Sequence, residues 1–292
     1  MKILLFGKTG QLGWELQRTL APLGNVWAYG PDEFDLADLQ QIERIIKESQ
    51  PNMIVNAAAY TAVDRAEEEP DVATLLNAKA PAVMAEAART LKAVFVHYST
   101  DYVFDGSKGS SYTEDDAPNP LNVYGQSKLD GETAIRQVGG AHIIMRTSWV
   151  YSVGSGGFVS KLLSWARKQE KMRIVTDQIG SPTWARMLAE VSAATVARSL
   201  SDPWEYFSER AGVYHLGGAG SVSRFDFTRE VLRLDLHPEE HTVRVLEPAL
   251  TEDFPTPARR PLVTPLDCSR FERVFGLHLP PWEGALRLAM GN

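Results

Sequence analysis

A tyrosine and a lysine, Tyr124 and Lys128, stand four residues apart in a stretch that predicts a helix over 121–138. Residues at this spacing lie on the same face of a helix. Tyrosine has an ordinary pKa of about 10, and a nearby ammonium lowers it by favouring the phenolate. The pair is therefore suited to give a proton to a carbonyl oxygen while hydride reaches the carbonyl carbon. The spacing alone is common, and a solvated helix face is the alternative interpretation.

Two hydroxyl residues, Ser99 and Thr100, end a strand predicted over 94–100. Ligands of open α/β sheets bind at the carboxyl ends of the parallel strands. A hydroxyl at that place can hydrogen-bond a substrate oxygen, which strengthens the interpretation of Tyr124 as a proton donor.

Three glycines, Gly7, Gly10 and Gly13, directly follow a strand predicted over 2–6 and open the next helix. Glycine lets the backbone turn tightly and approach a pyrophosphate, which then lies at the positive N-terminus of the helix. The spacing differs from G-x-G-x-x-G, and a tight turn without a ligand is the alternative. The place of the glycines after the first strand favours dinucleotide binding.

The second predicted strand, 25–29, leads into Gly30, where dinucleotide-binding folds often place an acid for the adenosine ribose. Gly30 has no side chain to fill that role. Asp35 and Leu36 in the following loop are expected at the adenine end of the cofactor, and no arginine there suits a 2′-phosphate. The choice between NADH and NADPH stays open.

The elements that must position these residues alternate between buried strands and amphipathic helices. This alternation predicts an α/β fold, a doubly wound, Rossmann-type parallel sheet with helices on both faces and a smaller C-terminal substrate-binding part. The second half is less regular, and the proline-rich segment 248–266 predicts irregular structure. The further strands are predicted over 53–59, 142–148, 173–176 and 213–217, and the further helices over 14–24, 39–49, 71–91, 158–169 and 184–199.

Composition excludes several classes of protein. The chain has 292 residues, and 30 Lys and Arg against 37 Asp and Glu give a net charge of −7. An acidic chain without a basic run is a poor binder of nucleic acid or of an anionic membrane. The single thiol, Cys268, cannot form an intrachain disulfide. The first residues lack the length of apolar sequence of a secretion signal, so we expect a cytoplasmic protein.

Several segments together resemble the extended short-chain dehydrogenases/reductases, and more narrowly the dTDP-4-dehydrorhamnose reductase family. The resemblance spans nearly the whole chain and depends on the combination of motifs. It implies NADPH- or NADH-dependent reduction of the C4 ketone of dTDP-4-dehydro-L-rhamnose to dTDP-L-rhamnose, the last step of dTDP-rhamnose biosynthesis. The segments are GKTGQLGWELQ (7–17), NAAAYTAVD (56–64), HYSTDYVFDG (97–106), YGQSK (124–128), RTSWVY (146–151), DQIGSPT (177–183) and PTPARRP (255–261).

The resemblance also implies roles for individual residues. Tyr124 is the expected proton donor, Lys128 its partner and a ligand of the nicotinamide ribose, and Thr100 a donor to the keto oxygen. The alternative interpretation of Trp149 is a core residue. The alternative interpretation of Arg259 and Arg260 is a solvated pair of charges. The expected cofactor ligands are Gly7, Gly10, Gln11, Leu12, Gly13, Asp35, Leu36, Ala59, Tyr60, Thr61, Tyr98, Tyr124 and Lys128, and the expected substrate ligands are Thr100, Asp101, Trp149, Arg259 and Arg260.

Two departures from the family pattern affect the expected partners. Some family members join two subunits around magnesium held by glutamates, and Glu15 matches one such position. Arg186 stands where another glutamate would be, and Glu190 is the alternative ligand, so we predict no metal. Tyr60 replaces a histidine that the family often has. A dTDP-linked 4-keto sugar is the expected ligand, and the resemblance allows a homodimer.

The expected organisation has two parts. Residues 1–149, with 182–220 returning, form the dinucleotide-binding part, and 150–181 and 221–292 the substrate-binding part. Three strand histidines, His97, His142 and His215, are predicted to be core residues without a catalytic role.

Two alternative functions stay open at this stage. One is reduction or epimerisation of another nucleotide-linked keto sugar. The other is a non-catalytic regulatory subunit of the methionine adenosyltransferase type, against which the complete set of Thr100, Tyr124 and Lys128 argues.

Overall fold

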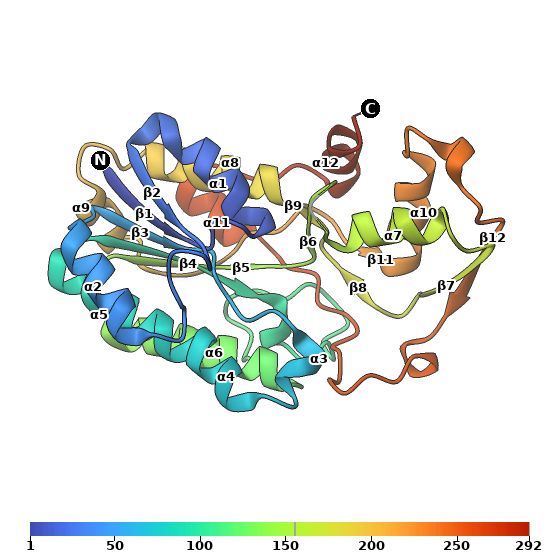
Figure 1. The fold of residues 1–292 in the computed structure, drawn as a ribbon, viewed down its shortest axis with the longest axis horizontal. Helices are drawn as coiled ribbons and strands as arrows, with labels where there is room; N and C mark the ends of the chain where they lie inside the picture. The colour runs from blue at the N-terminus through green and yellow to red at the C-terminus, as the bar shows by residue number, and fades with distance from the viewer. Residues whose placement is uncertain (155, 292) are drawn as a thin grey trace.

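A six-stranded parallel sheet forms the centre of the computed structural model, which describes residues 1–154 and 156–291 (Figure 1). Its strand order is β10-β5-β4-β3-β1-β2, so the chain winds outward in both directions from the middle of the sheet. This arrangement confirms the predicted fold class. The strands are β1 (Lys2–Phe6), β2 (Asn25–Tyr29), β3 (Met53–Asn56), β4 (Val94–Thr100), β5 (His142–Thr147) and β10 (Gly212–His215).

Helices cover both faces of this sheet because its strands are apolar on both sides. Ile3 and Leu5 of β1 point into one core layer, and Leu4 and Phe6 point into the other. The first layer is closed by α1 (Gln11–Leu20), α8 (Ala185–Ala197) and α11 (Ser269–Phe275), and the second by α2 (Leu39–Ser49), α5 (Ala80–Leu91) and α6 (Val123–Val138) (Figure 1).

The helix predicted over 71–91 contains a π-helical segment. It runs as α4 (Pro70–Thr74), η2 (Leu75–Lys79) and α5 without a break. A π turn adds a residue to the helix and often marks a functional site. Here it places the buried Asn77, whose amide pairs with both backbone groups of Tyr60 and donates to Ser127 Oγ on α6. The segment therefore ties the loop after β3 to α6.

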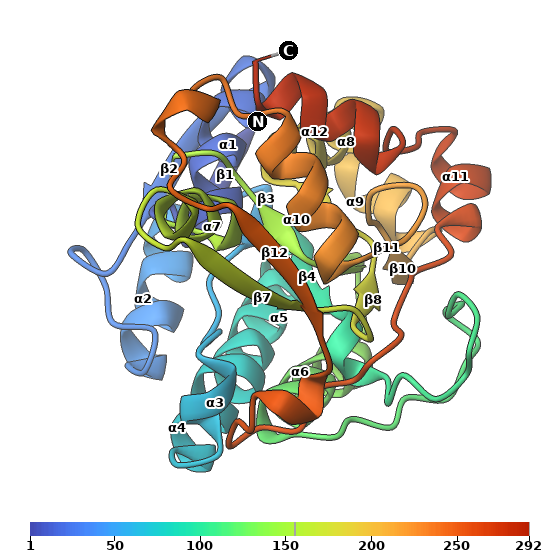
Figure 2. The same cartoon turned by 90° about the vertical axis from the view of Figure 1, so that its right-hand side faces the viewer.

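The second half of the chain builds a smaller core beside the sheet. Strands β7 (Lys171–Val175) and β12 (Val245–Ala249) pair in parallel and lie side by side in Figure 2. Tyr151, Phe227 and Trp282 are buried between these strands and the surrounding helices. Those helices are α7 (Phe158–Ala166), α10 (Arg224–Arg233) and α12 (Trp282–Ala289).

Short elements connect the two cores. Strand β6 pairs with β9, and β8 pairs with β11, so the crossing segments support each other. With these four strands, the short elements of the described chain are α3 (Val63–Ala66), α9 (Pro203–Ser208), β6 (Val150–Tyr151), β8 (Ile179–Gly180), β9 (Thr183–Trp184), β11 (Val222–Ser223) and the 3₁₀ turns η1 (Ala21–Leu23), η3 (Asp101–Val103), η4 (Pro238–Glu240) and η5 (Thr251–Asp253). No helix of the described residues has the length and apolarity needed to cross a membrane.

Several predicted boundaries were wrong. Strand β3 ends at Asn56 instead of residue 59, because 57–59 leave the sheet. Helix α1 begins at Gln11 and ends at Leu20, earlier at both ends than the prediction of 14–24. The segment 248–266 begins inside β12, where Pro248 is tolerated because that strand pairs on one side. Helices α9 to α12 had no predicted counterpart.

The division into two parts stays a prediction. Strand β10 and helix α8 do return to the large sheet after the crossing segments. Helix α11 also packs there, since Phe271 and Phe275 are buried in the first core layer.

A buried ion pair fastens α6 to the sheet. The Glu132 carboxylate on α6 accepts hydrogen bonds from Nε of Arg146 on β5 at 2.9 and 3.2 Å and from its Nη2 at 2.6 Å. The side chains are 1% and 4% exposed, and the Ser99 hydroxyl donates to the same carboxylate. A bidentate pair of this kind fixes both distance and orientation.

Replacing Glu132 by alanine should therefore destabilise the protein strongly. Arg146 would keep a buried charge without its partner, a loss that typically costs about 3–5 kcal/mol. The free energy of unfolding from urea titration measures it. Asp130→Ala is the control, since Asp130 is exposed on the same helix and accepts only from Gln126. Equal stability of the two variants would contradict the prediction.

Candidate active site

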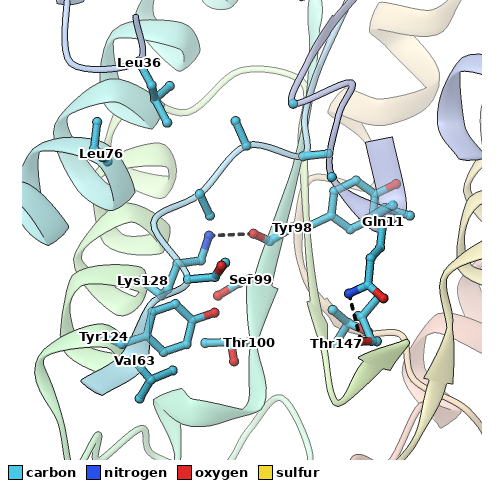
Figure 3. A pocket seen from close by; sticks show the side chains of 18 of the residues that line it. Gln11, Leu36, Val63, Leu76, Tyr98, Ser99, Thr100, Tyr124, Lys128 and Thr147 are labelled. Atoms are coloured by element: carbon cyan, nitrogen blue, oxygen red, sulfur yellow. Dashed lines mark hydrogen bonds between the residues drawn. The ribbon is translucent and has the colours of Figure 1, made fainter. Parts of the chain in front are cut away.

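One cavity of about 1160 Å³ lies at the carboxyl ends of the central strands (Figure 3). The glycine turn, the segment after β2, the loop after β3 and the end of β4 all line it. Most residues predicted for the site meet here, although their roles stay predictions. Those that line the cavity are Gly7, Gly10, Gln11, Leu12, Asp35, Leu36, Ala59, Thr61, Tyr98, Thr100, Asp101, Tyr124, Lys128 and Trp149, and those that do not are Gly13, Tyr60, Arg259 and Arg260.

The glycine turn is built by close packing. Gly7 has φ +94°, and a Cβ there would lie 2.6 Å from the Ala58 nitrogen. A Cβ at Gly13 would lie 1.9 Å from the Gly7 oxygen, so Gly13 lets α1 pack onto the turn. At Gly10 a Cβ would meet only the Gly7 oxygen, at 3.5 Å, and no side chain caps the α1 N-terminus. This open helix end suits a pyrophosphate.

The side chain of Tyr60 points away from the cavity. Its hydroxyl donates to Glu69 at 2.8 Å, and burial followed by this bond raises the pKa of Tyr60. Its neighbours Ala59 and Thr61 line the cavity instead. Tyr60 therefore anchors the loop after β3. Gln11 of α1 anchors the segment after β6 in the same way, because its side-chain oxygen accepts from the backbone N–H and the hydroxyl of Ser152.

The Tyr124 hydroxyl points toward Thr100 at the end of β4 (Figure 3). Helix α6 is placed by its N-cap, Asn122, whose side chain accepts from the Gly125 N–H at 2.8 Å. Thr100 itself accepts from the Tyr102 N–H at 3.2 Å, which fixes its hydroxyl at the strand end. A helix residue and a strand residue thus present two hydroxyls to one point of the cavity.

Lys128 is buried, and it lines the cavity. Its Nζ donates to the Tyr98 carbonyl at 2.7 Å and lies 3.2 Å from His97 Nε2. Burial lowers the pKa of Lys128 to about 8, and the nearby Glu132 partly opposes this shift. An ammonium has three N–H donors, so one remains for a ligand.

The expected lowering of the tyrosine pKa was wrong for this state of the protein. Burial raises the pKa of Tyr124, and a hydrogen bond with Thr100 opposes the rise. Lys128 makes no contribution because its ammonium is directed at Tyr98 and His97. The helical spacing was right, but it does not fix the direction of a long side chain.

Asp101 joins three segments at the cavity wall. Its carboxylate accepts from Thr264 at 2.6 Å, from Ser148 at 2.9 Å and from Thr100 at 3.3 Å. Burial raises the pKa of Asp101, while these hydrogen bonds oppose the rise. The residue holds the tail against the sheet as well as facing the cavity.

Trp149 is held in an unusual conformation. Its φ is +45°, a rare value for a bulky residue. Its indole lies on Gly180, where a Cβ would be 2.5 Å from the ring. Such conformations persist when the surroundings enforce them, and they concentrate at functional sites.

Arg224 is a cavity residue that sequence reasoning missed. Its guanidinium stacks 3.5 Å from the Trp149 ring centre and 4.7 Å from that of Phe158. Among the described residues the guanidinium has no hydrogen-bond or ion-pair partner, while the Arg224 backbone N–H donates to the Gln178 carbonyl at 3.0 Å. Burial lowers the pKa of Arg224 to about 10, so it stays charged at neutral pH. It stands alone at the start of α10, without a recognisable motif.

The predicted arginine pair lies outside the cavity lining. Arg260 pairs with Asp64 at 2.6 Å, and it donates to the Tyr102 hydroxyl at 3.3 Å. Arg259 is exposed, and its carbonyl accepts from Asn122. The Arg260 charge therefore serves a local ion pair, and Arg259 is held through its backbone.

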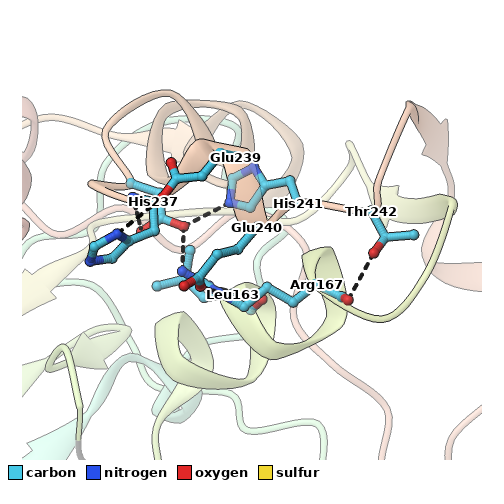
Figure 4. Close-up of polar contacts among 8 residues, drawn as sticks. Leu163, Arg167, His237, Glu239, Glu240, His241 and Thr242 are labelled. Carbon is cyan, nitrogen blue, oxygen red and sulfur yellow. Dashed lines mark hydrogen bonds and ion pairs between the residues drawn. The ribbon is translucent and has the colours of Figure 1, made fainter.

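The acidic positions considered for a metal are engaged with arginines. Glu15 lies 3.8 Å from Arg18, and Glu190 pairs with Arg186 at 3.0 Å. Within the described chain, one group has ligand atoms close enough for a metal ion, and it is exposed: His237, Glu239 and Glu240. Glu240 already pairs with Arg167 at 2.6 Å (Figure 4), so we assign no metal to this group.

The three strand histidines are buried. His142 and His215 face backbone carbonyls, at 3.0 Å in each case. His97 contacts both Lys128 and Asn56, and burial lowers its pKa well below the usual value. His97 is thus part of the support of Lys128, a contact that its place in an apolar strand gave no reason to expect.

Comparison with known proteins gives consistent similarities over the whole chain. A family described as RmlD substrate binding domain matches residues 1–292. A dTDP-4-dehydrorhamnose reductase of Burkholderia thailandensis is 41% identical over 99% of this chain and 98% of its own. The structure of a dTDP-4-dehydrorhamnose reductase from Clostridium acetobutylicum superimposes with a TM-score of 0.89. The two sequences are 34% identical, and the match covers 100% of this chain and 99% of the other. The structure of a Bacillus anthracis dTDP-4-dehydrorhamnose reductase in complex with NADP superimposes with a TM-score of 0.86. Its sequence is 32% identical, and the match covers 98% of this chain and 97% of the other.

The lowered pKa of Lys128 predicts a pH-dependent stability difference. Between about pH 8 and its ordinary pKa of 10.5, the unfolded chain binds more protons at Lys128 than the folded chain. Stability from this group therefore rises with pH in that window. Any advantage of Lys128→Met over the natural protein should be largest below pH 8 and shrink toward pH 10. Urea unfolding at several pH values measures this trend, and a constant difference would contradict it.

Proposed function

The chain belongs to the dTDP-4-dehydrorhamnose reductase family, and on that premise we propose that it reduces the C4 ketone of dTDP-4-dehydro-L-rhamnose to dTDP-L-rhamnose. It is an NAD(P)H-dependent oxidoreductase of dTDP-rhamnose biosynthesis. The observation that carries the site assignment is the meeting of Tyr124, Thr100 and Lys128 in one cavity at the sheet's carboxyl edge. The substrate is a dTDP-linked sugar, and NADPH or NADH is the cofactor.

The residues at the glycine turn fit a dinucleotide. The space above Gly10 is open, the α1 N-terminus lacks a side-chain cap, and Ala57 to Ala59 continue the wall. When bound, the reduced nicotinamide supplies hydride to the ketone carbon. An N–H of Lys128 would be given to a ribose hydroxyl, since the Tyr98 carbonyl takes only one of the three.

Tyr124 gives the proton in this proposal. The C4 carbonyl oxygen is placed between the hydroxyls of Tyr124 and Thr100, and it becomes a hydroxyl by taking the Tyr124 proton. Charge that develops on this oxygen is stabilised by both donors, once the Thr100 hydroxyl turns its proton from Asp101 to the substrate. Burial raises the pKa of Tyr124, which keeps it protonated until the oxygen gains charge. Its phenolate is then reprotonated from solvent.

We assign the substrate diphosphate to Arg224. A guanidinium suits phosphate oxygens, and this one is held rigid between two aromatic rings without a carboxylate partner. Arg259 and Arg260 stay candidates that would have to rearrange, because Arg260 is paired with Asp64. The strained Trp149 then serves as the platform for Arg224.

The homodimer and the cytoplasmic location also remain proposals. Sedimentation would measure association of two copies.

Turnover measured as loss of nicotinamide absorbance with synthetic dTDP-4-keto sugar tests the proposal. Reaction with other nucleotide-linked keto sugars in preference to this one would favour another reductase or an epimerase. Complete lack of turnover with intact cofactor binding would favour a non-catalytic regulatory subunit.

Tyr124→Phe should retain its fold and cofactor affinity but lose most of its kcat. It removes the proton donor, and general acid–base catalysis contributes on the order of 10²–10⁴-fold. Tyr151→Phe is the matched control, because its buried hydroxyl has no hydrogen-bond partner within 1–154 and 156–291 and lies outside the cavity lining. A near-natural kcat in Tyr124→Phe would exclude the role.

Arg224→Met should raise KM for the dTDP sugar roughly 10–100-fold, because hydrogen bonds to charged groups contribute about 1.5–3 kcal/mol. Affinity for NADH should stay the same, and methionine keeps an apolar side chain against Trp149. The control is Arg229→Met on the same helix, where Arg229 is exposed and pairs with Asp226. An unchanged KM in Arg224→Met would place the diphosphate elsewhere.

A further inference from the structure

Two buried polar side chains of the central sheet, Asn56 and His97, lie in line with Lys128. The register of the sheet pairs Asn56 of β3 with His97 of β4, so the two stand side by side. The imidazole lies between the other two groups. Its Nδ1 is 3.1 Å from Asn56 Nδ2, and its Nε2 is 3.2 Å from Lys128 Nζ. The three residues are 1%, 0% and 2% exposed, so these contacts are shielded from water.

The Ala58 backbone fixes the orientation of this row of groups. The Ala58 N–H donates to Asn56 Oδ1 at 3.1 Å, which leaves the Asn56 NH₂ facing His97. An NH₂ group only donates, so His97 Nδ1 must accept. Burial, followed by the Lys128 charge, lowers the pKa of His97 well below its usual value, so the ring is neutral and carries one proton. That proton therefore lies on Nε2.

The Nε2–H group of His97 points at Lys128 Nζ. An ammonium has N–H donors and no acceptor, so its N–H and that of His97 would oppose each other at 3.2 Å. An amine instead accepts from Nε2–H with its lone pair and still donates to the Tyr98 carbonyl at 2.7 Å. Reversing the ring tautomer would set Nδ1–H against the Asn56 NH₂, and turning that amide would break its bond with Ala58. The row of contacts is thus complete only when Lys128 is an amine.

The other charged groups around Lys128 do not oppose the ammonium. Glu132, one helical turn further along α6, favours it, although this carboxylate is shared with Arg146 of β5. Asp101 of η3 is engaged by Ser148 and Thr264. On the other elements that pack against α6, the charged residues are paired, bonded to backbone or exposed: Asp64, Arg65, Glu67, Asp71, Lys79, Glu86 and Arg89.

We propose that His97, oriented by Asn56, is a positioning residue that destabilises the ammonium form of Lys128 relative to the amine. The inference rests on the proposed function, in which Lys128 holds the cofactor ribose. Burial lowers the pKa of Lys128 to about 8, and the His97 N–H acts in the same direction. The tautomer of one buried imidazole therefore helps to set the pH above which the cofactor loses a cation at its ribose.

The test is the pH midpoint at which Lys128 loses its proton, followed by NMR of the full-length protein with ¹³C at lysine Cε and assigned with Lys128→Met. Asn56→Asp keeps the acceptor for Ala58, and its second oxygen accepts from Nδ1–H, so Nε2 becomes an acceptor for the ammonium. The midpoint should rise by about one pH unit. His97→Gln should raise it as well without adding a charge, because its amide is free to turn the oxygen toward Lys128.

The tautomer is read separately by ¹⁵N NMR of the histidine rings, in which protonated and unprotonated ring nitrogens differ in chemical shift. His97 should carry its proton on Nε2 in the natural protein and on Nδ1 in Asn56→Asp. Asn52→Asp is the control, because it adds the same charge at the exposed start of β3 and keeps an acceptor for the Lys2 N–H. It should change neither the tautomer nor the midpoint. In the two test variants, the pH above which NADPH affinity falls should rise with the midpoint.

Each outcome bears on this inference apart from the proposed function. A proton on Nδ1 of His97 in the natural protein overturns it, and so does an unchanged midpoint in both test variants. A midpoint that rises in Asn56→Asp but not in His97→Gln also overturns it, because the added charge would then be responsible. If Asn56→Asp does not fold, His97→Gln decides alone. The expected tautomer and midpoints in a protein that does not reduce the keto sugar would overturn the proposed function instead.

Discussion

The position of α6 depends on the buried pair of Glu132 and Arg146. Two long side chains with 1% and 4% exposure pay a large desolvation cost, which only a bidentate geometry offsets. The pair therefore permits one register of α6 against β5. Since Tyr124 and Lys128 stand on α6 and Thr100 on β4, that register decides whether their functional groups meet. The Ser99 hydroxyl adds β4 to the same junction.

Burial then sets the electrostatics of the groups so assembled. It raises the pKa of Tyr124 and Asp101 and lowers that of Lys128 and His97, in each case by penalising the charged form. The free protein thus holds an undissociated Tyr124 hydroxyl in the same cavity as a lysine that is mostly charged at neutral pH and loses its proton above about pH 8. A bound cofactor and sugar would bring hydroxyls and phosphates next to these groups. Their pKa values in the complex would therefore differ from those in the free protein.

Local sequence patterns predicted the central sheet and the glycine turn well. Apolar strands and amphipathic helices gave the doubly wound sheet, and G-x-x-G-x-x-G gave the turn at its edge, because these depend on short-range periodicity and glycine sterics. In the second half they predicted α7, α8, β7 and β10 but missed α9 to α12. They also failed at the π-helical segment, where Asn77 is placed by Tyr60 and Ser127 and not by its neighbours.

The sequence by itself determined that Thr100, Tyr124 and Lys128 reach the cavity, since strand ends and helix spacing bring them to one edge. Only the tertiary structure decided where their side chains point and which distant groups join them. Lys128 turns to Tyr98 and His97, and Arg224 comes from a helix 75 residues after Trp149, whose ring it covers. The direction of a long, flexible side chain depends on which partners lie within its reach. When such a partner is far away in the sequence, local sequence patterns cannot predict the contact.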